Sequence, residues 1–81
     1  MTGAFGPAGW LVASDERLKE NIEPVGALNN GLNVYTCNYI GDPTTHIGLL
    51  AQEVAEKDPY AVGDIGGGYL GVDYARATED A

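Results

Sequence analysis

The stretch SDERLKENI, residues 14–22, contains side chains that are suited to nucleophilic chemistry. A serine hydroxyl is a weak nucleophile until a nearby base takes its proton. A lysine amine can be that base if burial lowers its pKa toward neutrality. Ser14 and Lys19 supply one group of each kind. The stretch therefore poses a question: either the chain can cut itself here, or an ordinary helix begins here.

The same residues also fit a helix start. Ser14 is a good N-cap, and the two acids that follow it favour the positive end of a helix dipole. Leu18 and Ile22 are four residues apart and would share one helix face. We therefore predict one or two helical turns within residues 14–23. In this interpretation Lys19 is solvated or paired with a neighbouring glutamate.

A regular helix would separate the two reactive groups. Five residues correspond to a rotation of about 500°, so Ser14 and Lys19 would point about 140° apart. The two side chains meet only if the chain turns at Ser14 or if the lysine comes from another subunit.

Three further elements follow along the chain. Residues 33–40 are rich in aromatic and β-branched side chains, which is typical of a strand. Residues 46–57 carry an amphipathic helical stripe that Asp58-Pro59 terminates. Residues 60–65 and 69–74 read as a hairpin around a Gly-Gly-Gly turn.

These elements predict a small α+β fold, with one short antiparallel sheet and one main amphipathic helix packed on it. We expect a core of Leu18, Ile22, Val34, Tyr35, Tyr39, Ile47, Leu50, Val54, Leu70, Val72 and Tyr74.

Both ends of the chain are set apart by composition. Residues 1–13 combine glycines with Phe5, Trp10 and Leu11, which predicts an extended docking arm that contains a strand at residues 10–13. The alternative is a disordered N-terminus. Residues 75–81 have no apolar pattern, so we expect them to fray. We assign Arg17 to the interface with the three arm residues, because it needs an acidic partner within the chain or in another chain.

The small size of the chain predicts an oligomer. The 81 residues form at most one domain, and a domain of this size buries only about 60% of its unfolded surface. Cys37 is the single cysteine and His46 the single histidine, so a disulfide is excluded and a zinc site is disfavoured. We expect no metal and no cofactor. A partner subunit is the remaining source of stability.

The net charge of −8 restricts the partners. Affinity for nucleic acid comes mainly from Lys and Arg, which neutralise phosphates, and this chain has four such residues against twelve acids. No apolar run approaches the ~20 residues that span a bilayer. We therefore expect neither a nucleic-acid partner nor membrane insertion.

Three blocks together resemble one known family. SDERLKENIEPV (14–25), HIGLLAQEV (46–54) and YLGVDY (69–74) occur in the order and spacing of the endosialidase-type intramolecular chaperone domain, the peptidase S74 family. The tyrosine-rich strand VYTCNY between the first two blocks is similar to the family's own aromatic strand. The resemblance spans residues 14–74, which we treat as the domain.

The resemblance implies a role in bacteriophage tail spikes and tail fibres. Such domains assist trimerisation of the fibre, and many then cut themselves off before the serine of the first block. On this chain the bond is Ala13-Ser14, with Ser14 as the nucleophile and Lys19 as the base. The family's long helices after the last block are missing here, and only 13 residues stand where the fibre would be.

Three functions follow as expectations. The first, which we favour, is a virion structural protein: a small trimeric component of a phage tail tip, fibre or spike, made in the bacterial cytoplasm, whose arm docks on other tail proteins. The second is a self-cleaving chaperone with an active Ser14-Lys19 dyad. The third is a tip that binds a host glycan. Its candidate tyrosines are Tyr35, Tyr39, Tyr69 and Tyr74.

Overall fold

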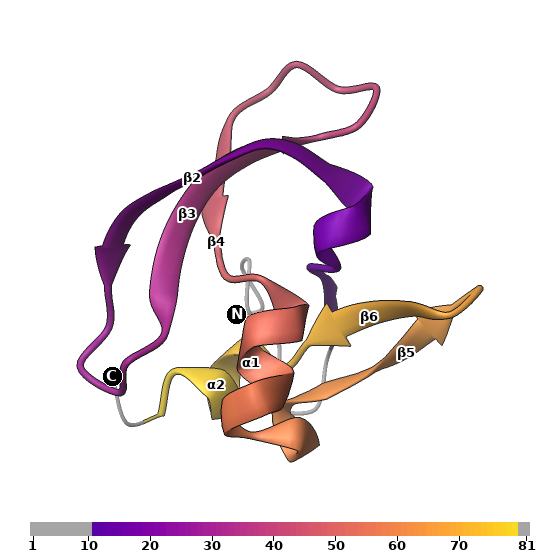
Figure 1. The fold of residues 1–81 in the computed structure, drawn as a ribbon. Coiled ribbons are helices and arrows are strands. Elements are labelled where there is room, and N and C mark those ends of the chain that lie inside the picture. The colour runs from indigo at the N-terminus through magenta and orange to yellow at the C-terminus, as the bar shows by residue number, and fades with distance from the viewer. Residues whose placement is uncertain (1–10, 80–81) are drawn as a thin grey trace.

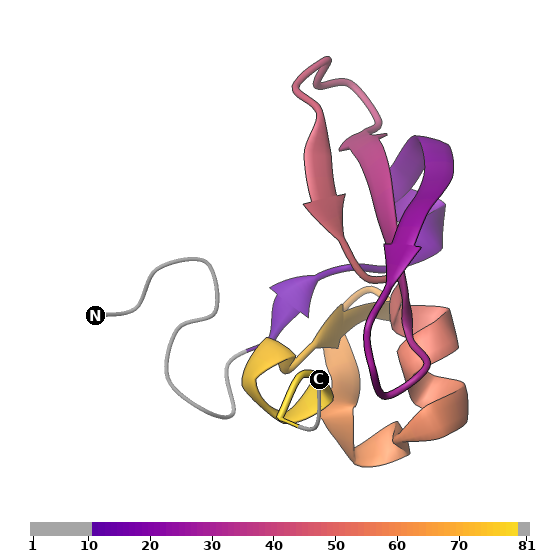
Figure 2. The same cartoon turned by 90° about the vertical axis from the view of Figure 1, so that its left-hand side faces the viewer.

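The described part of the chain forms two small antiparallel sheets and two short α-helices. The structure is a computed structural model, and it describes residues 11–79. One sheet has the strand order β2-β3-β4, and the other has the order β1-β6-β5. In Figures 1 and 2 the β2-β3-β4 sheet rises above the layer that contains the helices and the other sheet. The fold class is α+β, as predicted, but there are two sheets where the sequence predicted one.

Of the one or two helical turns predicted within residues 14–23, the structure has a single short turn, and the rest of the segment is strand. A single turn of 3₁₀ helix, η1 (Glu16–Leu18), leads directly into strand β2 (Lys19–Ala27). Its N-cap is Asp15, whose carboxylate accepts the backbone N–H of Arg17. Asn21 has a φ of 55°, in the left-handed region, where an α-helix cannot continue.

Strand β2 pairs with the strand that the tyrosine-rich segment forms. This strand is β3 (Asn33–Tyr39), which confirms the prediction for residues 33–40, and it pairs on its other side with β4 (His46–Gly48). The register places Lys19 opposite Tyr39. The lysine of the first sequence block and an aromatic residue of the next segment are therefore neighbours.

The main helix is shorter than its sequence pattern. Helix α1 runs over Ala51–Lys57, because residues 46–48 are strand β4. Leu50, Ala51 and Val54 are buried as the stripe predicted, but Ile47 is 72% exposed. A strand turns Ile47 away from the face that a helix would have buried.

The second sheet contains the predicted hairpin. A 3₁₀ turn, η2 (Pro59–Ala61), leads into β5 (Val62–Gly66), which pairs with β6 (Tyr69–Val72). Strand β1 (Val12–Ala13) pairs with the other side of β6. Helix α2 (Tyr74–Ala77) follows, so the tail that was expected to fray from residue 75 begins as helix.

The core is thin and made of small side chains. The buried cluster lies between α1, α2 and β6 and comprises Leu32, Leu49, Ala51, Val54, Ala61, Val72 and Ala77. Of the expected core, Leu50, Val54 and Val72 are buried and Ile47 is exposed; the others are partly buried. Several large apolar side chains remain exposed, namely Leu11, Val25, Ile40, Ile47, Tyr60, Ile65 and Tyr69.

Candidate functional site

Ser14 lies in the fully buried junction between strand β1 and the turn η1. Its side chain has no exposed surface. Its backbone N–H donates to the Leu70 carbonyl of β6 (3.2 Å), and its carbonyl accepts the N–H of Ala51 at the start of α1 (2.9 Å). The position as N-cap belongs to Asp15. The structure therefore does not use the Ser14 hydroxyl in the helix-capping role that the sequence predicted.

The peptide bond before Ser14 is held on its carbonyl side by a tyrosine. The Tyr39 hydroxyl donates to the carbonyl oxygen of Ala13 at 2.5 Å. This carbonyl belongs to the bond that the resemblance marked for cleavage. Strand β3 thus places a hydrogen-bond donor on that bond.

Lys19 is 6% exposed although it carries an amine. Its Nζ donates to the Leu49 carbonyl at 2.9 Å and lies 5.6 Å from the centre of the Tyr39 ring. The ion pairs among residues 11–79 are Arg17-Asp15 and Arg76-Asp58, so none neutralises Lys19. Burial lowers the pKa of Lys19, because an apolar environment disfavours the charged form.

Leu49 and Tyr74 connect the lysine to the serine. Leu49 accepts from Lys19 through its carbonyl and donates its N–H to the Tyr74 hydroxyl at 2.9 Å. That hydroxyl lies 3.2 Å from Ser14 Oγ. Ser14 and Lys19 share no direct hydrogen bond in the structure. The chain does turn after Ser14, as their meeting required, and the hydrogen bond between Leu49 and Tyr74 links the contacts of the lysine to those of the serine.

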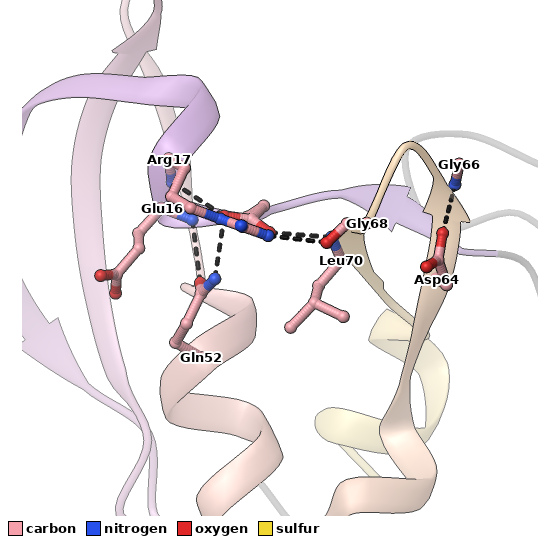
Figure 3. A network of polar contacts seen from close by, with 8 residues as sticks. Glu16, Arg17, Gln52, Asp64, Gly66, Gly68 and Leu70 are labelled. Atoms are coloured by element: carbon pink, nitrogen blue, oxygen red, sulfur yellow. Dashed lines mark hydrogen bonds and ion pairs between the residues drawn. The ribbon is translucent and has the colours of Figure 1, made fainter.

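Asp15 fixes the backbone around the serine. It is fully buried, and its carboxylate accepts hydrogen bonds from Arg17, from the Gln52 side chain on α1 and from the Leu70 N–H on β6. These bonds, chiefly those from the Arg17 side chain, hold the pKa of Asp15 well below its usual range. Figure 3 shows Arg17 and Gln52 converging between the turn and the hairpin.

Arg17 therefore has an intramolecular partner. Its guanidinium binds Asp15 at 2.6 Å, donates to the Gly68 carbonyl and lies over the Tyr69 ring at 5.1 Å. The sequence left open whether its acid would be in the same chain or in another. The structure supplies one in the same chain, while 57% of the Arg17 side chain stays exposed.

A cavity of about 430 Å³ lies beside these groups. Lys19, Tyr39, Leu49 and Tyr74 line it, and most of the other lining side chains are apolar. Cys37 also lines it. Apolar walls weaken the solvation of a charged amine, which explains the direction of the Lys19 shift. The described residues contain no cluster of three or more metal-ligating side chains.

The outcome for the predicted site residues is mixed. Ala13 and Ser14 are adjacent in the chain, and Lys19 is linked to Ser14 through Leu49 and Tyr74; their chemical roles remain a prediction. Leu11 is 37% exposed. Phe5 and Trp10 lie outside the described residues.

Sequence reasoning missed two groups that contact the reactive segment. Tyr39 and Tyr74 were expected as core or glycan-binding residues, whereas their hydroxyls bind Ala13 and Ser14. The tyrosine-rich segment was the available signal for Tyr39. Tyr39 pairs with Lys19 because of the register between β2 and β3. This pairing could not be predicted while the segment that contains Lys19 was expected to be helical.

Comparison with known families gives one match. The model for Peptidase_S74, described as chaperone of endosialidase, matches residues 14–63. The matched region starts at Ser14 and includes Lys19, Tyr39 and helix α1. No curated protein and no solved structure matches the chain. No helix among residues 11–79 is long and apolar enough to cross a membrane.

Proposed function

Because the chain belongs to the Peptidase_S74 family, the chaperones of endosialidase, we propose that it is an assembly domain of a bacteriophage tail fibre or tail spike that cuts its own chain between Ala13 and Ser14. The proposed product is a trimeric component of the virion, made in the host cytoplasm. This differs from the function that the sequence alone favoured, in which the domain assembles without cutting.

One observation leads us to favour cleavage: Lys19 is buried, and no acidic side chain among residues 11–79 forms an ion pair with it. A buried charge costs stability unless it is paired, so an unpaired buried lysine is expected mainly where the neutral amine has a task. The second observation is that Asp15, and not Ser14, caps η1. The Ser14 hydroxyl is then available for chemistry.

The arrangement supports an acyl shift followed by hydrolysis. The neutral Lys19 amine donates an N–H to Leu49 and keeps its lone pair. In the proposed reaction Lys19 Nζ approaches Ser14 Oγ, with which it shares no hydrogen bond in the structure, and takes its proton. Ser14 Oγ then attacks the Ala13 carbonyl carbon, and the Ser14 nitrogen leaves as an amine after taking the proton back from the Lys19 ammonium. Water hydrolyses the resulting ester. The products are an Ala13 carboxylate, a free Ser14 amine and the restored hydroxyl.

Intact-mass measurement of the purified 81-residue chain tests this proposal. We expect wild type to lose residues 1–13, and we expect Ser14→Ala and Lys19→Met to keep them. Lys57→Met is the matched control, because Lys57 is an exposed lysine on α1 and its variant should be cut like wild type. A folded wild-type chain that stays whole, or a Lys19→Met variant that is cut at the wild-type rate, would show the proposal to be wrong.

Assembly without cutting is the second candidate, and the exposed apolar side chains favour it to the extent that they require partners. It predicts an uncut wild-type oligomer.

Glycan binding is less well supported. The hydroxyls of Tyr35, Tyr39 and Tyr74 all lie within hydrogen-bonding distance of groups in the same chain. Binding to a glycan array that is lost in Tyr69→Ala would support it.

A further inference from the structure

The carbonyl oxygen of Ala13 would become negatively charged when Ser14 attacks, so its surroundings decide how fast the attack can be. Ala13 lies opposite Gly71 in the pairing of β1 with β6. The next pair, Ser14 and Leu70, is hydrogen-bonded through the Ser14 N–H. Hydrogen-bonded and non-hydrogen-bonded pairs alternate in an antiparallel ladder, so the Ala13 carbonyl points away from β6. The ladder cannot stabilise charge on this oxygen.

Tyr39 supplies the donor that the ladder lacks. Its hydroxyl donates to the Ala13 carbonyl oxygen at 2.5 Å. The ring is held by the pairing of Tyr39 with Lys19 across β2 and β3 and by an edge contact with His46, whose ring centre is 5.2 Å away. A donor fixed before the reaction needs no reorganisation when charge develops, and this is the main source of oxyanion stabilisation in enzymes.

We propose that Tyr39 is a catalytic residue of the cleavage, and that its hydroxyl stabilises the oxyanion that forms on Ala13. This inference rests on the proposed function, since an uncut chain has no such oxyanion. As Ser14 Oγ bonds to the carbonyl carbon, the carbonyl π electrons move to the oxygen, and the Tyr39 O–H strengthens its hydrogen bond there. When the Ser14 nitrogen leaves, the electrons return and the carbonyl reforms as the ester.

The protonation states agree with these roles. Burial raises the pKa of Tyr39, with smaller contributions from Tyr74 and Cys37, so the phenol remains a neutral donor. Burial lowers the pKa of Lys19. One apolar cavity lined by both groups thus favours a protonated phenol beside an unprotonated amine.

Replacement of Tyr39 by phenylalanine tests the inference, because it removes the hydroxyl and keeps the ring. The full chain is synthesised in a cell-free extract, samples are quenched in acid at intervals, and mass spectrometry measures the fraction cut. We expect Tyr39→Phe to cut about 10²–10³-fold more slowly, as for loss of one oxyanion donor. Tyr35→Phe is the matched control on the same strand face; its hydroxyl binds Glu53, and the rate should stay at the wild-type value.

The outcomes separate this inference from the proposed function. A wild-type chain that is never cut overturns both. A wild-type chain that is cut while Tyr39→Phe is cut equally fast overturns the role of Tyr39 alone. Thermal melting of the Ser14→Ala and Ser14→Ala/Tyr39→Phe chains, neither of which can be cut, shows whether the phenylalanine affects folding.

If the phenylalanine variant fails to fold, 3,5-difluorotyrosine at position 39 replaces it in the test. This residue has nearly the shape of tyrosine and a more acidic hydroxyl. At pH 6, where its hydroxyl is still protonated, a stronger donor should make the cut several-fold faster than in wild type. A rate equal to or below that of wild type would overturn the inference.

Discussion

Burial of the Lys19 amine lowers the stability of the folded chain at pH values where the unfolded chain carries the proton. This amine is buried among apolar side chains and has the Leu49 carbonyl as its hydrogen-bond partner. The pKa of Lys19 is lowered in the folded state, so the unfolded chain binds the proton more tightly. The free energy of unfolding therefore rises with pH, from the lowered pKa up to the ordinary value of about 10.4.

In the proposed cleavage, the ionisation of Lys19 sets the pH dependence of the rate. Only the neutral amine can take the Ser14 proton, so the cleavage rate should rise with pH through the lowered pKa and level off below about 10.4. The rate is measured by mass spectrometry from pH 5 to pH 10. A rate that does not change with pH, or one whose midpoint lies at the ordinary lysine value, would contradict this prediction.

At the residue scale the sequence pointed to the two groups that we propose to react and missed the groups around them. Ser14 and Lys19 carry chemistry that is visible from residue type alone. The Tyr39 hydroxyl acquires its importance from a contact with a backbone carbonyl 26 positions away. Such a contact depends on tertiary packing, which no local pattern encodes.

At the scale of elements, the Asp15 carboxylate joins the turn η1, helix α1 and strand β6 through hydrogen bonds. It accepts the Arg17 guanidinium, the Gln52 amide and the Leu70 N–H. A buried carboxylate that loses its charge leaves these donors with a weaker acceptor. Because Ser14 immediately precedes Asp15, these hydrogen bonds also hold the serine in place.

We expect Asp15→Asn to lower the free energy of unfolding by about 1.5–3 kcal/mol at pH 7, the range for a hydrogen bond to a charged group. The pKa of Asp15 is depressed, so its contribution is present above the ordinary carboxyl value of about 3.9 and is lost as the pH falls. The difference between variant and wild type should therefore shrink toward acid pH in urea unfolding experiments.

The control for this prediction is Asp64→Asn. Asp64 is exposed on β5, and its carboxylate accepts one backbone bond, from Gly66 (Figure 3). Its loss should change stability by much less. Equal effects of the two substitutions would mean that burial and multiple donors add nothing at Asp15.

The elements themselves were predicted with mixed success. The strand at 33–39 and the hairpin had strong local signals and are present. The segment after Ser14 has helix-forming residues, yet it pairs with β3 because sheet formation across the chain outweighs weak local propensity. The start of α1 moved to Ala51 for the same reason, since residues 46–48 complete that sheet.

For the molecule as a whole, the small core limits the stability of a single chain. Three of the seven residues in its buried cluster are alanines. The same chain exposes several large apolar side chains. A partner surface would bury these side chains. The length of the sequence alone predicted that the chain requires a partner subunit, but it did not indicate which faces are involved.

The proposed trimer makes stability dependent on concentration. Mass action favours the folded oligomer as protein concentration rises, so the melting temperature should increase across a dilution series. Light scattering should give three times the mass of the chain. A constant melting temperature together with the mass of a single chain would contradict the proposal.

Strand β1 consists of two residues, and it occupies one side of β6 while β5 occupies the other. The proposed scission falls directly after β1, and the described part of the released peptide, residues 11–13, pairs with β6 through two residue pairs. If this peptide dissociates, β6 becomes an edge strand on that side, and its backbone N–H and C=O groups there lose their partners. Such an edge recruits a strand from elsewhere. The proposed cut would therefore free the edge of β6 that β1 occupies. A strand of another tail component could pair with this edge only after cleavage.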